Sequence, residues 1–402
     1  MSKWKTCIIG DIGTVVGGAT PSTKKEENYL DGTISWITPK DLAGFSGRYI
    51  SRGERNITEI GLNSCSTQLM PAHTVLFSSR APIGYVAIAE NEVCTNQGFK
   101  SVIPNTDTDY MFLYYLLKYN KNKIENLGSG TTFKEVSGST MRNVEIKVPE
   151  TIEEQRKVAS ILSAIDDKIE NNNAINDNLL QQISAIFKHW FTNNPELDSM
   201  TQVPLADLCA VVTKGTTPTT LGKPFVSKGI NFIKAESIQD NHSIDKNKFA
   251  YIDDETNNLL KRSIISAGDI VFTIAGSLGR FAFVDDSVLP ANTNQAVAII
   301  RADTSKVTPE YLYSFFLGNW HNDYYTKRIQ QAVQANLSLG TIKSLPIPVL
   351  SDQAMFEYLG LITPLIAMTK SNELEIVRLA QVRDTLLPQL MSGKLDVSNI
   401  DI

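Results

Sequence analysis

The sequence predicts an α+β protein built as a tandem repeat. We expect two similar mixed α/β domains and two long helices, which pair as an antiparallel coiled coil with approximate twofold symmetry. Heptad spacing of apolar residues runs through 151–194, a second such run begins at position 351, and the segment between them repeats the motifs of the first 150 residues. The predicted boundaries, alternating domain and helix, are 1–150, 151–196, 197–350 and 351–402.

The first long helix is predicted from seam residues that alternate at spacings of four and three, which keeps them on one face. They are Val158, Leu162, Ile165, Ile169, Asn172, Asn176, Leu179, Ile183, Ile186 and Trp190. Thr151 and Glu154 form a capping-box pattern, and Asn193, Asn194 and Pro195 indicate the end. About 40 residues at ~1.5 Å each reach roughly 60 Å, more than one domain needs. The narrow stripe therefore requires a partner helix.

The same spacing near the end of the chain predicts that partner. Its seam residues are Met355, Leu359, Ile362, Ile366, Thr369, Glu373, Ile376, Leu379, Leu386 and Leu390, with a stop at Gly393. Both seams are polar in the middle, which favours antiparallel pairing with a buried polar contact that fixes the register. Pro364 leaves two possibilities open, because it either kinks this helix or occupies its first turn with Thr363 as cap. The alternative is two unrelated helices, each lying on its own domain.

Composition limits the classes of protein. With 402 residues the chain has room for two or three domains. It has no run of 18 apolar residues and no basic-then-apolar leader, so we expect a soluble, unexported, cytoplasmic protein. The cysteines lie far apart, with no Cys-x-x-Cys, and predict buried thiols rather than a disulfide framework or zinc site. They are Cys7, Cys65, Cys94 and Cys209.

The net charge of −5 is unevenly distributed. Residues 1–150 hold 16 basic and 15 acidic side chains, and residues 201–350 hold 14 and 13. Residues 151–200 hold 4 and 8, and residues 351–402 hold 4 and 7, so the acidity belongs to the helical segments. The charge count alone does not favour nucleic acid, and any basic face must come from local clustering.

The two mixed domains share an order of motifs. The opening PLADLCAVVTKGTTPTT parallels IIGDIGTVVGGATPST, GINFIKAESI parallels TISWITPKDL, and AGDIVFTIAGSLGRFAFV parallels AHTVLFSSRAPIGYVAI. An amphipathic helix and a last strand then follow in both copies. Thr-Asn-Gln recurs at 95–97 and 293–295, an offset of 198 that also separates Gln155 from Gln353. The loops differ, so we expect the two domains to recognise different things.

The proline-containing strands before the helices, the ending AIFKHWF at 185–191 and the terminal LLPQLMSGKL at 386–395 resemble the specificity subunit of a type I restriction-modification system. The resemblance covers the whole chain as two target-recognition domains alternating with two helical regions. It implies a non-catalytic subunit that binds double-stranded DNA at a bipartite, asymmetric target. It also implies two methyltransferase subunits and restriction/translocase subunits as partners. S-adenosylmethionine, ATP and Mg are then expected on those partners and not on this chain.

No catalytic pattern accompanies this organisation. The segment GTTPTTLGKP at 215–224 fails as a phosphate-binding loop, and Glu145 with Lys147 predicts an exposed strand edge rather than half a nuclease site. The four histidines are scattered, with no paired base or nucleophile. A stand-alone enzyme and a protein-binding coiled-coil scaffold without DNA specificity are the alternatives. Incubation with DNA, Mg²⁺ and S-adenosylmethionine would test the first, and a DNA mobility shift the second.

Candidate DNA contacts are loop residues able to hydrogen-bond to bases or phosphates. In the first domain they are Lys40, Ser79, Arg80, Asn96, Gln97, Lys100, Thr132 and Lys134. In the second domain they are Lys234, Thr273, Arg280, Asn294, Gln295, Gln331, Gln334 and Asn336. The repeated Thr-Asn-Gln has an alternative interpretation, a turn whose side chains satisfy its own backbone. No metal site is predicted.

Overall fold

The computed structural model describes residues 3–45, 47–80, 82–130, 134–195, 197–329 and 336–397. These residues divide into two compact units, Met1–Asn171 with Ile376–Ile402, and Asn172–Glu375. Each unit therefore contains one mixed domain together with parts of both long helices. Among the described residues, no helix has the length and apolar composition to cross a bilayer.

The described residues of the first unit form three sheets. An antiparallel pair joins β1 (Trp4–Ile8) to β10 (Glu145–Pro149), next to the short helix α1 (Ile9–Ile12). The central sheet has the order β2 (Gly13–Gly17), β9 (Lys100–Pro104), β6 (Val75–Ser79), β7 (Ile83–Ala89) and β4 (Tyr49–Ile50). The third has the order β5 (Asn56–Ile57), β3 (Ile34–Ile37) and β8 (Cys94–Thr95), in which β3 and β8 run parallel. Its shorter helices are α2 (Glu59–Asn63), α3 (Tyr110–Tyr119), α4 (Lys121–Asn126) and α5 (Gly138–Arg142).

Among the described residues, the second unit repeats this topology except for an equivalent of β4, which confirms the predicted duplication. Its pair joins β11 (Gln202–Pro204) to β19 (Pro346–Pro348). The central sheet is β12 (Cys209–Lys214), β18 (Val297–Ala302), β15 (Ile270–Thr273) and β16 (Phe281–Phe283). The third sheet is β14 (Ala250–Ile252), β13 (Ile230–Ile233) and β17 (Ala291–Thr293), again with its last pair parallel. Its helices are α7 (Asp254–Leu259), α8 (Pro309–Leu317), α9 (Trp320–Ile329) and α10 (Leu339–Lys343).

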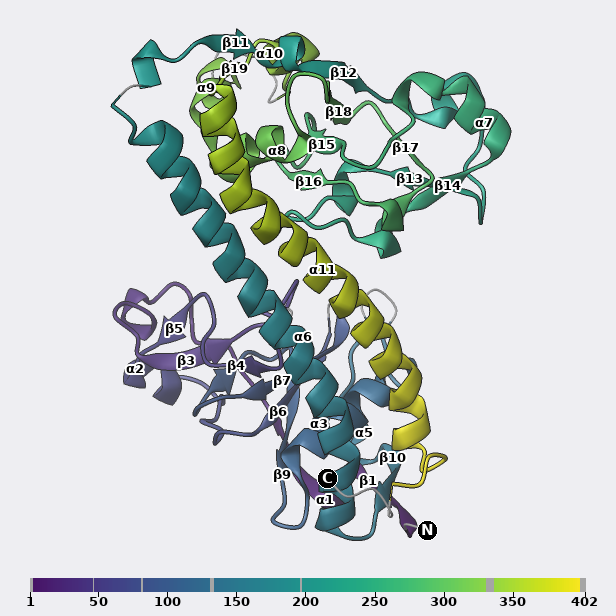
Figure 1. The fold of residues 1–402 in the computed structure, drawn as a ribbon. Coiled ribbons are helices and arrows are strands. Elements are labelled where there is room, and N and C mark those ends of the chain that lie inside the picture. The colour runs from purple at the N-terminus through teal and green to yellow at the C-terminus, as the bar shows by residue number, and fades with distance from the viewer. Residues whose placement is uncertain are drawn as a thin grey trace. The chain divides into compact units, whose positions relative to one another are not determined.

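The long helices are α6 (Ile152–Phe187), which continues into the π-turn η2 (Lys188–Thr192), and α11 (Asp352–Met391) (Figure 1). The Thr151 hydroxyl accepts a hydrogen bond from the Glu154 amide at 3.3 Å, as the capping pattern predicts. α11 is unbroken, so Pro364 lies inside it and neither ends nor starts a helix. The carbonyl that Pro364 leaves without a helical donor is that of Gly360, which is an exposed residue.

The predicted polar centre of the helix pair is confirmed within the second unit. Asn172 donates to the Glu375 carboxylate at 2.8 Å, and Asn176 donates to the Thr369 carbonyl at 3.3 Å and accepts from Asn372 at 2.8 Å. Partners fall in α11 as positions rise in α6, so the helices are antiparallel. The side chains of Asn172 and Asn176 are buried, which makes a shift of register costly because it would leave their amides without partners.

The buried stripes are wider than a coiled-coil seam because each helix also packs on a mixed domain. Val158 and Leu162 join the core beneath α3, with Leu390 from α11, while Ile165 and Ile169 are only partly buried. In the second unit Leu179, Ile183, Ile362 and Ile366 are buried, and Leu359 and Trp190 pack partly buried at the core's edge. Tyr358, absent from the predicted seam, is fully buried, whereas Ile376 is only partly so. An aromatic face on α8 draws Tyr358 inward, with the Tyr311 ring centroid 5.9 Å away.

Candidate DNA-recognition surfaces

The first candidate surface forms where the parallel strands β3 and β8 end. The Asn96 amide donates to the Ile37 carbonyl at 3.0 Å, which places the Thr-Asn-Gln turn beside the loop that carries Lys40. The Ser79 amide donates to the Gly98 carbonyl at 2.7 Å, and the Val136 amide donates to the Ser79 carbonyl at 3.0 Å. Segments far apart in the sequence therefore meet, and we name them loop cluster 1. They are Gly18–Thr20, Thr38–Lys40, Ser79–Arg80, Asn96–Gly98 and Lys134–Val136.

The second unit assembles loop cluster 2 through equivalent bonds. The Ile274 amide donates to the Ala296 carbonyl at 2.8 Å, and the Leu337 amide donates to the Ile274 carbonyl at 3.0 Å. The Gly215 amide donates to the Asn294 carbonyl at 3.1 Å. The members are Gly215–Thr217, Lys234, Thr273–Arg280, Asn294–Ala296 and Asn336–Leu337. The predicted residues that the structure describes therefore lie in or next to the loop cluster of their own unit.

The Thr-Asn-Gln turns use most of their polar groups on the fold itself. The Asn96 side-chain oxygen accepts from the Gly98 amide at 2.9 Å, and that of Asn294 accepts from the Ala296 amide at 3.1 Å. The side-chain oxygen of Gln97 accepts a hydrogen bond from the Thr20 hydroxyl, and that of Gln295 accepts one from the Thr217 hydroxyl. Backbone runs so close that a Cβ at Gly18 would lie 2.1 Å from the Thr95 carbonyl oxygen, and one at Gly215 would lie 1.8 Å from that of Thr293. The turns therefore keep the frame, as the alternative interpretation predicted, and contact of these four side chains with DNA stays a prediction.

Two predicted contacts lie inside the protein. Ser79 and Thr273 are both fully buried. The Thr273 hydroxyl accepts from the Arg280 amide at 2.8 Å and donates to the Ser277 carbonyl, so it closes the turn between β15 and β16. Ser78 does the same in the first unit, because its hydroxyl accepts from the Tyr85 amide at 2.8 Å. Ser79 and Thr273 have no exposed surface through which to contact a duplex, so the structure does not support them as DNA contacts.

The cations of loop cluster 1 face acidic neighbours. Arg80 and Lys100 both lie 3.7 Å from Glu135, and Lys40 lies 2.6 Å from Glu54 on an exposed surface. An exposed pair such as Lys40 with Glu54 contributes little to stability, ~0–1 kcal/mol, so a phosphate can displace that carboxylate at small cost. Lys134 is exposed beside this group.

Loop cluster 2 pairs its cations more tightly. Arg280 donates twice to Asp240, both bonds at 2.7 Å, and Lys234 lies 2.5 Å from Glu236. The Arg280 guanidinium is therefore already fixed in a planar, two-bond geometry, the geometry with which arginine also recognises guanine. Asn336 is exposed, whereas Thr132, Gln331 and Gln334 lie outside the described residues.

The sequence did not predict a cavity that Arg280 lines in the second unit. Its volume is about 310 Å³, and its lining includes His242, Phe281, His321 and Tyr325. Burial lowers the pKa of His242 and of His321 to about 4, so both rings are neutral at pH 7. The signal in the sequence was faint, since each histidine stands alone and the cavity joins distant segments.

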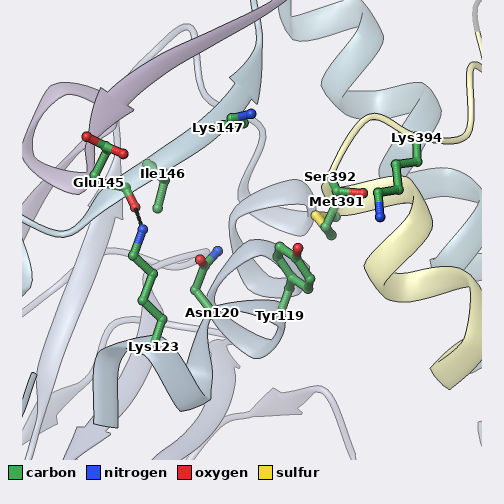
Figure 2. Close-up of a pocket in the computed structure, with 9 residues that line it drawn as sticks. All are labelled: Tyr119, Asn120, Lys123, Glu145, Ile146, Lys147, Met391, Ser392 and Lys394. Atoms are coloured by element: carbon green, nitrogen blue, oxygen red, sulfur yellow. Dashed lines mark hydrogen bonds between the residues drawn. The ribbon is translucent and has the colours of Figure 1, made fainter. Parts of the chain in front are cut away.

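A second cavity, of about 480 Å³, lies at the end of α11 in the first unit (Figure 2). Lys123 donates to the backbone carbonyl of Glu145 at 2.6 Å, and Figure 2 shows the carboxylate of Glu145 turned away from that lysine. Glu145 and Lys147 are exposed residues of β10, which places them on the predicted strand. Among the residues described by the structure, no group of three or more His, Cys, Asp or Glu side chains could hold a metal ion, and all four cysteines are free.

Comparison with known proteins agrees with this architecture. The type I restriction modification DNA specificity domain matches residues 1–181 and 198–375. The chain is 33% identical over 417 residues to the type I restriction enzyme MjaIX specificity subunit of Methanocaldococcus jannaschii, covering 99% of this chain and 94% of that protein. It is 30% identical over 195 residues to the EcoR124I/EcoR124II specificity subunit of Escherichia coli, covering 47% of this chain and 46% of that protein.

The fold is likewise similar to a solved one. The crystal structure of a type I restriction-modification system S subunit from M. genitalium matches with a TM-score of 0.59 at 16% identity, covering 97% of this chain and 96% of that chain. Both halves of the present chain match the family, and each half contains one loop cluster on the same strand frame. The chain therefore belongs to the family of type I restriction-modification DNA specificity subunits.

Proposed function

We propose that this chain selects the DNA target of a type I restriction-modification complex by reading one half-site with loop cluster 1 and a different half-site with loop cluster 2. The observation that carries this proposal is one strand frame built twice with different side chains at its tips. Arg80, Lys100 and Lys134 mark the first tip, and Arg280 with Asp240 marks the second. Unlike tips on a common frame favour two unlike half-sites, hence an asymmetric target.

The experiment is methylome sequencing of cells that express this chain with its cognate methyltransferase. We expect one motif made of two short unlike sequences separated by a fixed gap of unspecified bases. A matched strain carrying Arg280→Ala should show altered methylation at one half-site and an unchanged sequence at the other. A motif that is continuous, or that changes at both halves in this variant, would contradict the assignment.

We also propose that the helices and adjoining surfaces carry two methyltransferase subunits and that restriction/translocase subunits join the same complex. Exposed apolar side chains on α11, which are costly to leave in water, support a partner surface there. Phe356 is 76% exposed, Met368 52% and Leu361 49%. Native mass spectrometry of the assembled complex should show two methyltransferase copies, and a single copy at saturation would refute this stoichiometry.

In this proposal the chemistry belongs to the partners, which would bind S-adenosylmethionine, ATP and Mg, while this chain performs no catalysis. It would act in the cytoplasm, where the DNA is. Incubating the purified chain alone with DNA, Mg²⁺ and S-adenosylmethionine should yield neither methylation nor cleavage, and product formation would overturn this part. Mobility shift with a duplex that contains the motif distinguishes the subunit from a protein-only scaffold, which would not bind DNA.

A further inference from the structure

Each mixed domain packs on one of the long helices at an equivalent place. The sequences of the two helices can be aligned there by matching their buried residues. Val158 and Tyr358 are buried, as are Leu162 and Ile362, and Asp166 and Ile366. The three pairs share an offset of 200, two more than the offset of the Thr-Asn-Gln turns. In this alignment Glu170 corresponds to Lys370, and Arg383 of α11 corresponds to Ile183 of α6, since Leu390 and Trp190 occupy matching helix ends.

In the first unit this docking point is ionic. Arg48, just before β4, is 5% exposed and donates to both oxygens of Glu170 at 2.8 Å and to Asp167. Arg383 donates to the buried Asp166 carboxylate at 2.9 Å. Burial alone would lower the pKa of Arg48, but its hydrogen bonds to Glu170 and Asp167 outweigh that effect and raise it. The guanidinium is therefore charged and fully committed to the helix.

Helix α3 of the same domain completes the network. The Tyr115 hydroxyl donates to Asp166 at 2.7 Å, and Lys118 is enclosed next to it, where burial lowers the pKa of its ammonium group. α3 lies against α6 (Figure 1). It therefore packs on α6 through polar groups as well as apolar ones. Removing a single member would leave a charge buried without its partner, which is far more costly than replacing the whole set by apolar groups.

In the second unit the equivalent docking point is mostly apolar, and the residue at the position of Glu170 is a lysine, which has the opposite charge. Ile366 and Ile183 lie in one core cluster where the first unit has Asp166 and Arg383. Lys370, at the position of Glu170, lies 2.8 Å from Glu373 and is itself mostly buried. His242 reaches this point from the mixed domain and lines, with Lys370 and Glu373, a cavity of about 10 Å³, room for no more than about one water.

We propose that Glu170 and Lys370 determine which mixed domain packs on which long helix, so that the two domains cannot exchange places. We call this pair of residues the docking key. A copy of the first domain placed on α11 would bring Arg48 against Lys370 and Tyr115 against Ile366. Both contacts would leave buried polar groups without partners. The docking key acts as a positioning device and needs no DNA. Its consequence, a fixed order of the two half-sites, rests on the proposed function.

The test is a pair of full-length chimeras in which residues 1–150 replace residues 197–350. The first keeps the native helices, and the second adds Lys370→Glu, Ile366→Asp and Ile183→Arg. Hydrogen exchange of the transplanted α3, measured in the complex with methyltransferase subunits, reports docking directly. We expect at least 10-fold faster exchange there in the first chimera than in the native first domain, and native protection in the second. Equal protection in both chimeras would overturn the proposal.

A reciprocal change in the native chain guards against a chimera that does not fold. Glu170→Arg should speed exchange in α3 at least 10-fold, and adding Arg48→Glu should restore protection, because the two changes re-form the ion pair with its charges reversed and the Asp167 side chain, 64% exposed, can turn into solvent. Arg52→Glu, the same substitution as Arg48→Glu but on an exposed loop, is the control for the second change: added to Glu170→Arg it should not restore protection. Failure of the reciprocal pair to restore protection would equally refute the docking key. A rescued chimera that docks but methylates no repeated half-site would refute the proposed function alone.

Discussion

If the long helices set the gap between half-sites, lengthening both should change the gap and leave the half-site sequences intact. The insertion points are Asn171/Asn172 in α6 and Glu375/Ile376 in α11, where the two units divide. Adding one heptad at both points preserves the seam and the hydrogen bond between Asn172 and Glu375. Seven residues at ~1.5 Å lengthen the pair by roughly 10 Å.

On DNA, 10 Å corresponds to about three base pairs at ~3.4 Å each. Three base pairs also rotate the second half-site about the DNA axis by roughly 100°, since one turn holds ~10 base pairs. One heptad rotates the end of a straight protein helix by only ~20°, so the domain would not follow the groove. We therefore expect a gap three base pairs longer with reduced methylation in the one-heptad variant. Three heptads add about 32 Å, close to the ~34 Å of a full DNA turn, and should restore efficient methylation with a gap about 10 base pairs longer.

Methylome sequencing of strains that carry the two double insertions measures both the gap and the half-sites. A heptad in α6 alone is the control, since it moves Asp166 out of register with Arg383 and should prevent assembly. An unchanged gap with altered bases would show that the helices are not the spacer.

Three further predictions test other parts of the molecule. Arg80→Ala should weaken recognition of one half-site only, because Arg80 belongs to loop cluster 1; equal loss at both halves in methylome data would indicate misfolding instead. Gly318→Ala should lower the free energy of unfolding of the second unit by ~1–3 kcal/mol in denaturant titration, since its Cβ would lie 2.1 Å from the Phe187 ring. Gly360→Ala, in an exposed turn of α11 with open space around the new Cβ, should raise that free energy by up to ~1 kcal/mol. The folded pKa of His321 lies at about 4, below its ordinary 6.5, so the folded state binds fewer protons. Its contribution to stability is present above pH 6.5 and is lost as pH falls towards 4; tryptophan fluorescence of unfolding should show this loss in the native chain, and an unchanged pH dependence in His321→Phe would contradict the assignment.

The long helices and the duplication were predictable because they rest on periodicity. Spacings of four and three persist through both helices, and tertiary packing only widened the buried stripe. The limit appears at Tyr358, which lies outside the predicted seam and is buried in the aromatic core of the second unit. Pro364 marks the same limit, since a helix of 40 residues held by packing on both sides tolerates one missing hydrogen bond.

The candidate site was predictable as a set of loops but not as individual contacts. Repeated motifs located both loop clusters, whose segments meet through backbone hydrogen bonds that sequence does not display. Ser79 and Thr273 were chosen for their hydroxyl groups, yet each continues a buried strand. In the structure Ser78 and Thr273 are equivalent, because the hydroxyl of each accepts a hydrogen bond from the amide seven residues later.

The same comparison explains why the two copies can diverge in what they read. Asn96 and Asn294 hold backbone amides, so changing either would disturb the frame rather than retune a contact. Arg80 and Arg280 leave the frame at different points of the hairpin, one at its start and one after its turn, and are paired with acids from different segments. Substitution should cost little stability at Arg80, which lies 3.7 Å from the Glu135 carboxylate, and more at Arg280, which is held by two bonds to Asp240. A frame fixed by side chains that bond to backbone, with cations at its tips that do not hold the frame together, permits recognition to change while the fold and its docking to the helices are retained.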